Sequence, residues 1–247
     1  LSDFYFDVEV MDFNDYNGKK YAKKDGGELG AAAAALGNKI KEVTKKYNVA
    51  QVNIVAHSFG GLVTQAYLLG MGADYDKKAD FEDDVNKVVY IQTPFYGVEL
   101  EGKDLRDMVD VTDYGRYAKD KVWEDILAYG SEEIFEMHNM LDADNIYEEK
   151  IDAISMFSED DNVVDVSSAS MSSFLGTRDN ESFDRYLMFK NYSHNSDPVE
   201  PAAETKGSLA WVEEFSDENF LTIASFLDDG GLWQNIGNSD IEKLYTI

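Results

Sequence analysis

The stretch Val55-Ala56-His57-Ser58-Phe59-Gly60-Gly61 decides the fold of this chain. An apolar strand is predicted over residues 50–56, directly before the serine, and the helical spacing of apolar residues resumes over residues 62–69, directly after the two glycines. A strand-to-helix turn this tight accepts only small residues beside a nucleophile. The motif therefore predicts a nucleophile elbow that exposes the Ser58 hydroxyl at the edge of a sheet. The alternative is an ordinary turn between a strand and a helix with an incidental serine.

Strands and helices are predicted to alternate on both sides of this elbow. Further strands are predicted over residues 4–13, 87–92, 153–157 and 185–190, and further helices over residues 29–47 and 220–227. Such alternation predicts an α/β fold in which helices cover both faces of a mainly parallel sheet. Residues 98–150 form an insertion with helical runs that is too long for a simple crossover. We expect a single domain, 1–247, that includes this insertion.

The composition is that of an acidic globular protein. The 49 Asp and Glu residues against 22 Lys and Arg give a formal net charge of −27, which repels nucleic acid and anionic membranes. No apolar stretch reaches the ~18 residues of a membrane-spanning helix, so no integral membrane segment is expected. A solvated surface explains the charge, and a specific cation-binding role is the alternative. The absence of cysteine excludes disulfides, thiolate catalysis and cysteine-bound zinc.

We expect neither a metal nor another cofactor. No His and Asp residues have the spacing of a zinc site, and no glycine-rich phosphate loop occurs. The acidic clusters at residues 74–76 and 80–84 lack the central glycine and final glutamate of an EF-hand loop. Solvated charge is therefore favoured over a calcium site in these clusters.

Two blocks of the sequence resemble bacterial lipases and lipase-like hydrolases of the α/β-hydrolase superfamily. The elbow matches that group's Ala-His-Ser-x-Gly-Gly pattern, and residues 88–97, Val-Val-Tyr-Ile-Gln-Thr-Pro-Phe-Tyr-Gly, match its strand followed by Thr-Pro-x-x-Gly. This group has no sharp boundary with the GPI-inositol-deacylase-like and acyltransferase-like lipases. The resemblance covers residues 8–227 and implies an α/β-hydrolase fold with residues 98–150 in the place of a helical lid or cap. It also favours an extracellular or cell-surface location over the cytoplasm.

The three histidines of the chain are the candidates for a general base, because a serine hydroxyl needs an imidazole to take its proton. His194 follows the last predicted core strand, where such hydrolases carry their base, and is the predicted base; a polar loop histidine is the alternative. His57 adjoins the nucleophile with its side chain expected to point away from it, and the family uses that position for packing or for lining the substrate pocket. His138 is predicted to be an ordinary surface or capping histidine.

The carboxylate that orients the imidazole is predicted to be Asp161. It lies in Ser158-Glu159-Asp160-Asp161-Asn162-Val163-Val164, which follows a predicted strand and resembles the family's Asp-x-Val-Val loop. The chain order Ser, Asp, His then agrees with that of α/β-hydrolases. Asp160 and Asp165 are the alternatives in this acidic loop, and Asp165 stands where the family usually has proline.

One donor of an oxyanion hole is predicted, the backbone N–H of Phe59 at the helix N-terminus. The family's second donor normally comes from a His-Gly-type loop after an earlier strand, and this sequence contains no such loop before Ser58. We therefore expect the first strands of the domain to lie upstream of residue 1, or the second donor to come from elsewhere.

The expected reaction is acyl transfer from a lipid or short acyl ester to water, through an acyl-enzyme on Ser58. His57, Phe95 and Trp123 are the predicted substrate-binding residues. The insertion either shields an acyl-chain site as a lid or is packed helical decoration. Two other functions remain open: an acyltransferase or thioesterase with the same triad, and a non-catalytic binding protein on a hydrolase fold.

Overall fold

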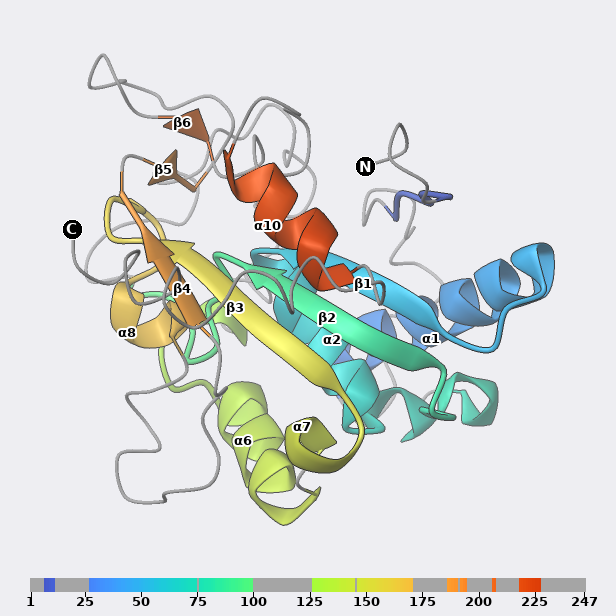
Figure 1. Ribbon diagram of the computed structural model, residues 1–247. Coiled ribbons are helices and arrows are strands. Elements are labelled where there is room, and N and C mark those ends of the chain that lie inside the picture. The colour runs from blue at the N-terminus through green and yellow to red at the C-terminus, as the bar shows by residue number, and fades with distance from the viewer. Residues whose placement is uncertain are drawn as a thin grey trace.

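The centre of the protein is a parallel sheet of four strands in the order β1-β2-β3-β4 (Figure 1). The computed structural model describes residues 7–11, 27–74, 76–99, 126–144, 146–170, 186–190, 192–194, 206–207 and 218–227. The strands are β1 (Val52–His57), β2 (Val85–Ile91), β3 (Asp152–Ser158) and β4 (Tyr186–Phe189). Because parallel strands point the same way, the loops that follow them meet at one edge of the sheet, where open α/β sheets bind their ligands.

Helices flank the sheet on both faces. They are α1 (Gly27–Tyr47), α2 (Phe59–Leu68), α6 (Glu132–Asp144), α7 (Ile146–Glu149), α8 (Val166–Ala169) and α10 (Glu218–Leu227), with the 3₁₀ turns η3 (Met71–Asp74) and η4 (Lys77–Ala79) after α2. Two short strands, β5 (Tyr192–Ser193) and β6 (Lys206–Gly207), pair with each other beyond β4. Within the described ranges, we find no helix with both the length and the apolar character needed to cross a membrane.

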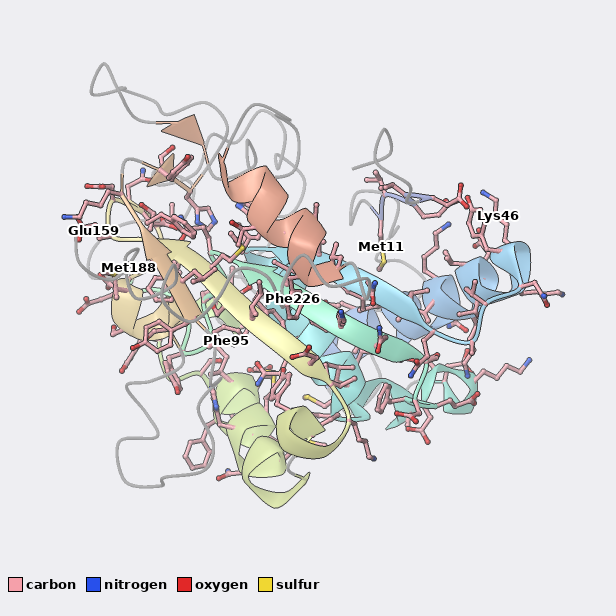
Figure 2. The ribbon with its side chains drawn as sticks, in the orientation of Figure 1. Met11, Lys46, Phe95, Glu159, Met188 and Phe226 are labelled. Atoms are coloured by element: carbon pink, nitrogen blue, oxygen red, sulfur yellow. The ribbon has the colours of Figure 1, made fainter. Side chains whose placement is uncertain are left out.

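Alternate side chains of the strands build the two largest of the three hydrophobic clusters in the described residues. Val88 and Tyr90 of β2 pack with the buried faces of α1 and α2 in the larger core. Val89 and Ile91 pack on the opposite face under α10, with Phe226 (Figures 1 and 2). A sheet covered on both faces needs strands with apolar side chains on both faces, as β2 has over its last four residues, 88–91. The two cores together fix the strand ends at which the candidate site lies.

The predicted strands and helices around the elbow are confirmed to within a few residues. The exception is the strand predicted over residues 4–13, because residues 7–11, its described part, form no strand. In this segment Glu9 accepts a hydrogen bond from the Tyr47 hydroxyl of α1 (2.8 Å), and Met11 packs on the larger core. Side-chain contacts with α1 and with the larger core therefore hold this segment, and its described residues, 7–11, pair with no strand.

The helical insertion predicted over residues 98–150 is described in part. Its described residues hold α6 and α7, which join the larger core through Ile134, Met137 and Ile146. These two helices therefore cover the same face of the sheet as α1 and α2. Trp123 lies outside the described residues.

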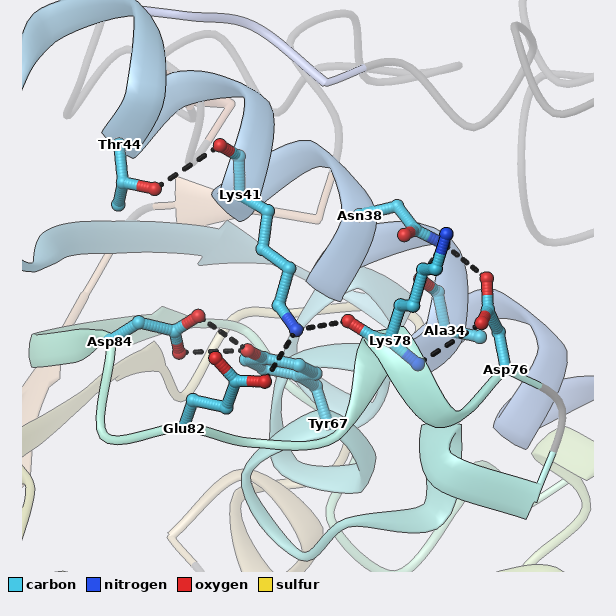
Figure 3. Close-up of polar contacts among 9 residues, drawn as sticks. All are labelled: Ala34, Asn38, Lys41, Thr44, Tyr67, Asp76, Lys78, Glu82 and Asp84. Atoms are coloured by element: carbon cyan, nitrogen blue, oxygen red, sulfur yellow. Dashed lines mark hydrogen bonds and ion pairs between the residues drawn. The ribbon is translucent and has the colours of Figure 1, made fainter.

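A polar cluster ties α1 and α2 to the segment that leads into β2 (Figure 3). The Tyr67 hydroxyl of α2 donates to the Asp84 carboxylate and lies 2.7 and 2.8 Å from its two oxygens. Lys41 of α1 pairs with Glu82 (2.9 Å) and donates to the carbonyl of Lys78. Burial raises the pKa of the Asp84 carboxyl and of the Tyr67 hydroxyl. The cluster fixes the sheet at the end remote from the strand carboxyl ends.

Candidate active site

Ser58 lies in a sharp turn between β1 and α2. Its backbone angles are φ 53° and ψ −128°, a region that residues other than glycine rarely occupy and that stores strain. The Ser58 N–H donates to the carbonyl of Ile91 (2.8 Å), and the Gly61 N–H donates to the carbonyl of Ser58 (2.9 Å). The end of β2 and the first turn of α2 thus hold the strained residue from both sides.

Three side chains from distant parts of the chain form one hydrogen-bonded series. Ser58 Oγ lies 2.7 Å from His194 Nε2, and His194 Nδ1 lies 2.9 Å from Asp161 Oδ2. Because the carboxylate accepts, Nδ1 carries the proton of the neutral imidazole, and Nε2 accepts from the Ser58 hydroxyl. The structure therefore brings together the three residues that the sequence predicts for a Ser-His-Asp triad.

The turn after β3 presents one carboxylate to the imidazole. Asp161 Oδ1 accepts the backbone N–H groups of both valines in the Asp-x-Val-Val stretch, at 2.7 and 2.9 Å. These bonds orient the side chain so that Oδ2 meets His194. The Asp161 side chain is buried, whereas Asp160 and Asp165 are exposed. Of the three carboxylates that the sequence offers, Asp161 is the one in contact with the imidazole.

His194 directly follows β5, is 3% exposed, and also receives a contact from His57. His57 Nε2 donates to the backbone carbonyl of His194 (3.0 Å), and the two ring centroids are 5.0 Å apart. Burial, together with the nearby His194, lowers the pKa of His57 to about 3, so its imidazole stays neutral near neutral pH. His57 therefore holds the loop that carries His194, a contact that the sequence did not indicate.

The loop after β2 is packed against the insertion. The Phe95 ring, predicted to bind substrate, is fully buried between the sheet and α6 and meets Tyr90 edge to face, with 5.1 Å between ring centroids (Figure 2). His138 of α6 donates from Nε2 to the Phe95 carbonyl (2.7 Å) and stacks on Tyr96, with 4.6 Å between ring centroids. The prediction of a surface or capping role for His138 is wrong, because the imidazole is buried against this loop.

The Thr-Pro-x-x-Gly block ends in a close contact between backbones. Gly97 has φ 87°, and a Cβ at this position would lie 2.6 Å from the carbonyl oxygen of Leu127, so only glycine fits. The Ser168 hydroxyl of α8 accepts the Tyr96 N–H (3.1 Å) and donates to the Gly97 carbonyl (2.7 Å). The glycine of the block thus lets the insertion approach the end of β2.

Phe59 is the first residue of α2, so its backbone N–H lies at a helix N-terminus directly after Ser58. Helix N-termini stabilise negative charge, which suits an anion that develops beside the serine. In the part of the chain that the structure describes, no three His, Asp or Glu side chains gather into a possible metal site. The site thus places an imidazole and a backbone N–H at a helix N-terminus beside Ser58.

Comparisons with known proteins place this geometry in context. Residues 20–204 match the model of a protein family described as "Alpha/beta hydrolase of unknown function (DUF915)". No curated protein matches the sequence.

Similar folds occur among solved structures. One is phospholipase PlaB from Legionella pneumophila in complex with thio-NAD, with a TM-score of 0.54 and 12% identity over 87% of this chain and 49% of that chain. A weaker match is the mature form of lipase BlEst2 from Bacillus licheniformis, with a TM-score of 0.39 and 15% identity over 67% of each chain. The chain spans about half the length of the phospholipase. At 12% identity, that likeness shows the fold alone, and it agrees with the predicted α/β-hydrolase fold.

Proposed function

The chain belongs to the DUF915 family of α/β hydrolases, and from this membership and the contacts of Ser58, His194 and Asp161 we propose that it is a serine carboxylic-ester hydrolase. The observation that carries the proposal is the pair of hydrogen bonds, 2.7 Å from Ser58 Oγ to His194 Nε2 and 2.9 Å from His194 Nδ1 to Asp161 Oδ2. A nucleophile within reach of a base that a third group orients is the geometry of covalent catalysis by serine.

The proposed reaction has two halves. In acylation, His194 Nε2 takes the hydroxyl proton as Ser58 Oγ attacks the ester carbonyl carbon. The tetrahedral intermediate collapses to an acyl-enzyme, and His194 gives the proton to the leaving alcohol. In deacylation, water attacks the acyl carbon while His194 takes its proton and then returns it to Ser58. One ester and one water become an acid and an alcohol.

Asp161 and Phe59 support different parts of this reaction. Asp161 keeps the proton of the neutral imidazole on Nδ1 and stabilises the imidazolium that forms during each half. The Phe59 N–H, at the N-terminus of α2, stabilises the oxyanion of the tetrahedral intermediate. Loss of one such donor typically slows catalysis by about 10²- to 10³-fold.

The proposed substrates are lipid or short acyl esters. The phospholipase with a similar fold is a reason to include phospholipids among the esters tested. We also propose that residues 98–150 cover the acyl site as a cap, because His138 of α6 binds the loop that follows β2.

Labelling of the full chain with a fluorophosphonate tests the proposal, because such a probe phosphonylates an activated serine. We expect mass spectrometry to find the adduct on Ser58 and to find none in Ser58→Ala. Labelling of His194→Ala should slow by about 10²- to 10⁴-fold, the range typical for loss of a general base. Esters of p-nitrophenol with increasing chain length then give the acyl preference, and an added alcohol shows whether an acceptor competes with water.

Circular dichroism and thermal melting of each variant separate lost chemistry from lost folding. A folded protein whose Ser58 takes no label contradicts the enzyme proposal and favours a binding protein on a hydrolase fold. Undiminished labelling of His194→Ala contradicts the assignment of the base.

A further inference from the structure

Ser158, the last residue of β3, is 1% exposed and bonds to both loops that carry the partners of Ser58. Its Oγ accepts the backbone N–H of Asp160 (3.2 Å) and the backbone N–H of Tyr192 (3.3 Å). Asp160 directly precedes Asp161, and Tyr192 stands two residues before His194. One buried hydroxyl thus joins two segments that are more than thirty residues apart along the chain.

The backbone of Ser158 also takes part in the turn that presents the acid. Its carbonyl accepts the Asp161 N–H at 3.4 Å. The next residue, Glu159, donates its N–H to the carbonyl of Phe189 in β4 (3.0 Å). The turn therefore begins from a fixed point, and the two bonds to the Asp161 carboxylate complete its geometry.

Gln92 fixes Ser158 relative to the nucleophile. The Gln92 side chain is fully buried, and its Oε1 accepts the Ser158 N–H at 3.1 Å. The Gln92 N–H donates to the carbonyl of Met156 in β3 (2.9 Å), and the carbonyl of the preceding residue, Ile91, accepts the Ser58 N–H. Two consecutive residues at the end of β2 therefore bond to the nucleophile turn and to Ser158.

Gln92 adopts φ 49°, in the left-handed region that residues other than glycine avoid. Strained backbone of this kind persists where the surrounding structure holds it in place. The bonds of Gln92 to β3 supply that restraint, and they hold its side chain where it meets Ser158.

We propose that Ser158 is a positioning residue, whose hydroxyl holds the Asp161 turn and the His194 loop in the register that aligns the two side chains. The inference rests on the proposed function, since it assigns a role in the same triad. Ser158 does not touch Ser58 Oγ or an ester. It acts through Asp161 and His194, because a shift of about 1 Å in a catalytic group lowers a rate by as much as about 10²-fold.

Ser158→Ala removes the shared acceptor and tests the inference by kinetics on a p-nitrophenyl ester. We expect kcat to fall by about 10- to 100-fold while KM stays within about twofold, because alignment of the triad affects the reaction and not ester binding. Ser158→Cys is the second variant. It keeps the shape of the side chain with a somewhat larger atom and replaces the hydroxyl by a weak acceptor, so we expect a loss of kcat here too.

Ser155→Ala is the matched control. Ser155 lies in the same strand, is fully buried, and donates from Oγ to the carbonyl of Ala169 in α8 (2.8 Å), so its hydroxyl bonds to neither Asp160 nor Tyr192. This variant loses one buried bond from a serine hydroxyl to the backbone, where Ser158→Ala loses two, so its melting temperature should also fall while kcat stays near that of the parent. Equal kinetic loss in the two variants would assign the effect to general loosening of the fold and overturn the inference.

A spectroscopic measurement separates this inference from the proposed function. Proton NMR observes the His194 Nδ1–H that bonds to Asp161, and the signal is assigned by its loss in His194→Ala. We expect Ser158→Ala to weaken or shift this signal and Ser155→Ala to leave it in place.

Each outcome decides one of the two proposals. If the parent protein takes no fluorophosphonate at Ser58, the proposed function is overturned. The NMR signal of His194 Nδ1–H still shows in that case whether His194 and Asp161 are aligned. A folded Ser158→Ala with an unchanged signal overturns the positioning role, whatever the activity of the parent.

Discussion

His57 is an imidazole that the fold keeps neutral. Burial and the adjacent His194 lower its pKa to about 3, against an ordinary value of 6.5. As the pH falls below 6.5, the unfolded chain takes up this proton while the folded protein does not. Above pH 6.5 His57 is neutral in both the folded and the unfolded state, so it does not change the free energy of unfolding. Between pH 6.5 and about 3, the free energy of unfolding decreases by up to about 1.4 kcal/mol for each pH unit that the pH falls.

We expect His57→Gln to lack this loss at acid pH. The glutamine keeps an N–H donor for the carbonyl of His194 but has no proton to gain. Urea unfolding of both proteins at about pH 7.5, 6 and 5 gives the difference in free energy of unfolding at each pH. The difference should move in favour of the variant as the pH falls, whereas two parallel curves would show that His57 is not a buried neutral group. Titrating residues that do not interact with His57 are common to both proteins and cancel.

Helix α2 packs on the end of β2 without room for a side chain at Gly61. A Cβ there would lie 2.0 Å from Thr93 Oγ1 and 2.5 Å from Thr93 Cγ2. We expect Gly61→Ala to lower the free energy of unfolding by about 1–3 kcal/mol, the usual effect of overpacking. In a Thr93→Ala background this loss should shrink but not vanish, because the two closest atoms are removed while Thr93 Cβ, 2.7 Å from the added Cβ, remains.

Thr93→Val is the matched background, since valine keeps two branches at Cβ and hence the same crowding. A double-mutant cycle from urea unfolding should give coupling between Gly61→Ala and Thr93→Ala but little with Thr93→Val. Equal losses in all three backgrounds would mean that α2 moves away from β2 instead of being held there.

The elements of this fold differ in how far the sequence predicts them. The strands and helices on either side of Ser58 are predicted because apolar periodicity reflects burial, and both faces of the sheet are buried. Residues 7–11 have a similar alternation but form no strand, because a strand needs a partner to which its backbone can bond. Their apolar side chains are not all buried either, since Val10 is 82% exposed. Periodicity reports which side chains are apolar and not which backbones pair.

The same distinction applies to the site. Ser58, Asp161 and His194 are predicted from local motifs and from their order in the chain. The supporting contacts of His57 and Ser158 are not predicted, because each joins residues that only the folded sheet brings together. A buried serine at a strand end has no local pattern that separates it from any other core serine.

At the scale of the whole molecule, the formal net charge of −27 sets the field in which a substrate approaches. Three exposed carboxylates, Glu159, Asp160 and Asp165, flank Asp161 in the sequence, and Lys190 pairs with Glu159 (2.9 Å). The local and the global charge therefore have the same sign. Such a field attracts cationic esters, repels anionic ones and weakens as salt shortens the Debye length.

The salt dependence of kcat/KM should therefore follow the charge of the ester. Between about 10 mM and 0.5 M NaCl, we expect kcat/KM to fall several-fold for an ester with a quaternary ammonium group and to rise several-fold for one with a free carboxylate. An uncharged ester of similar size is the control, and its kcat/KM should change little. Measurement of all three at one pH separates the field from effects of salt on the fold, which would change the three alike. A common curve for the three esters would mean that the acidic surface has no part in substrate capture.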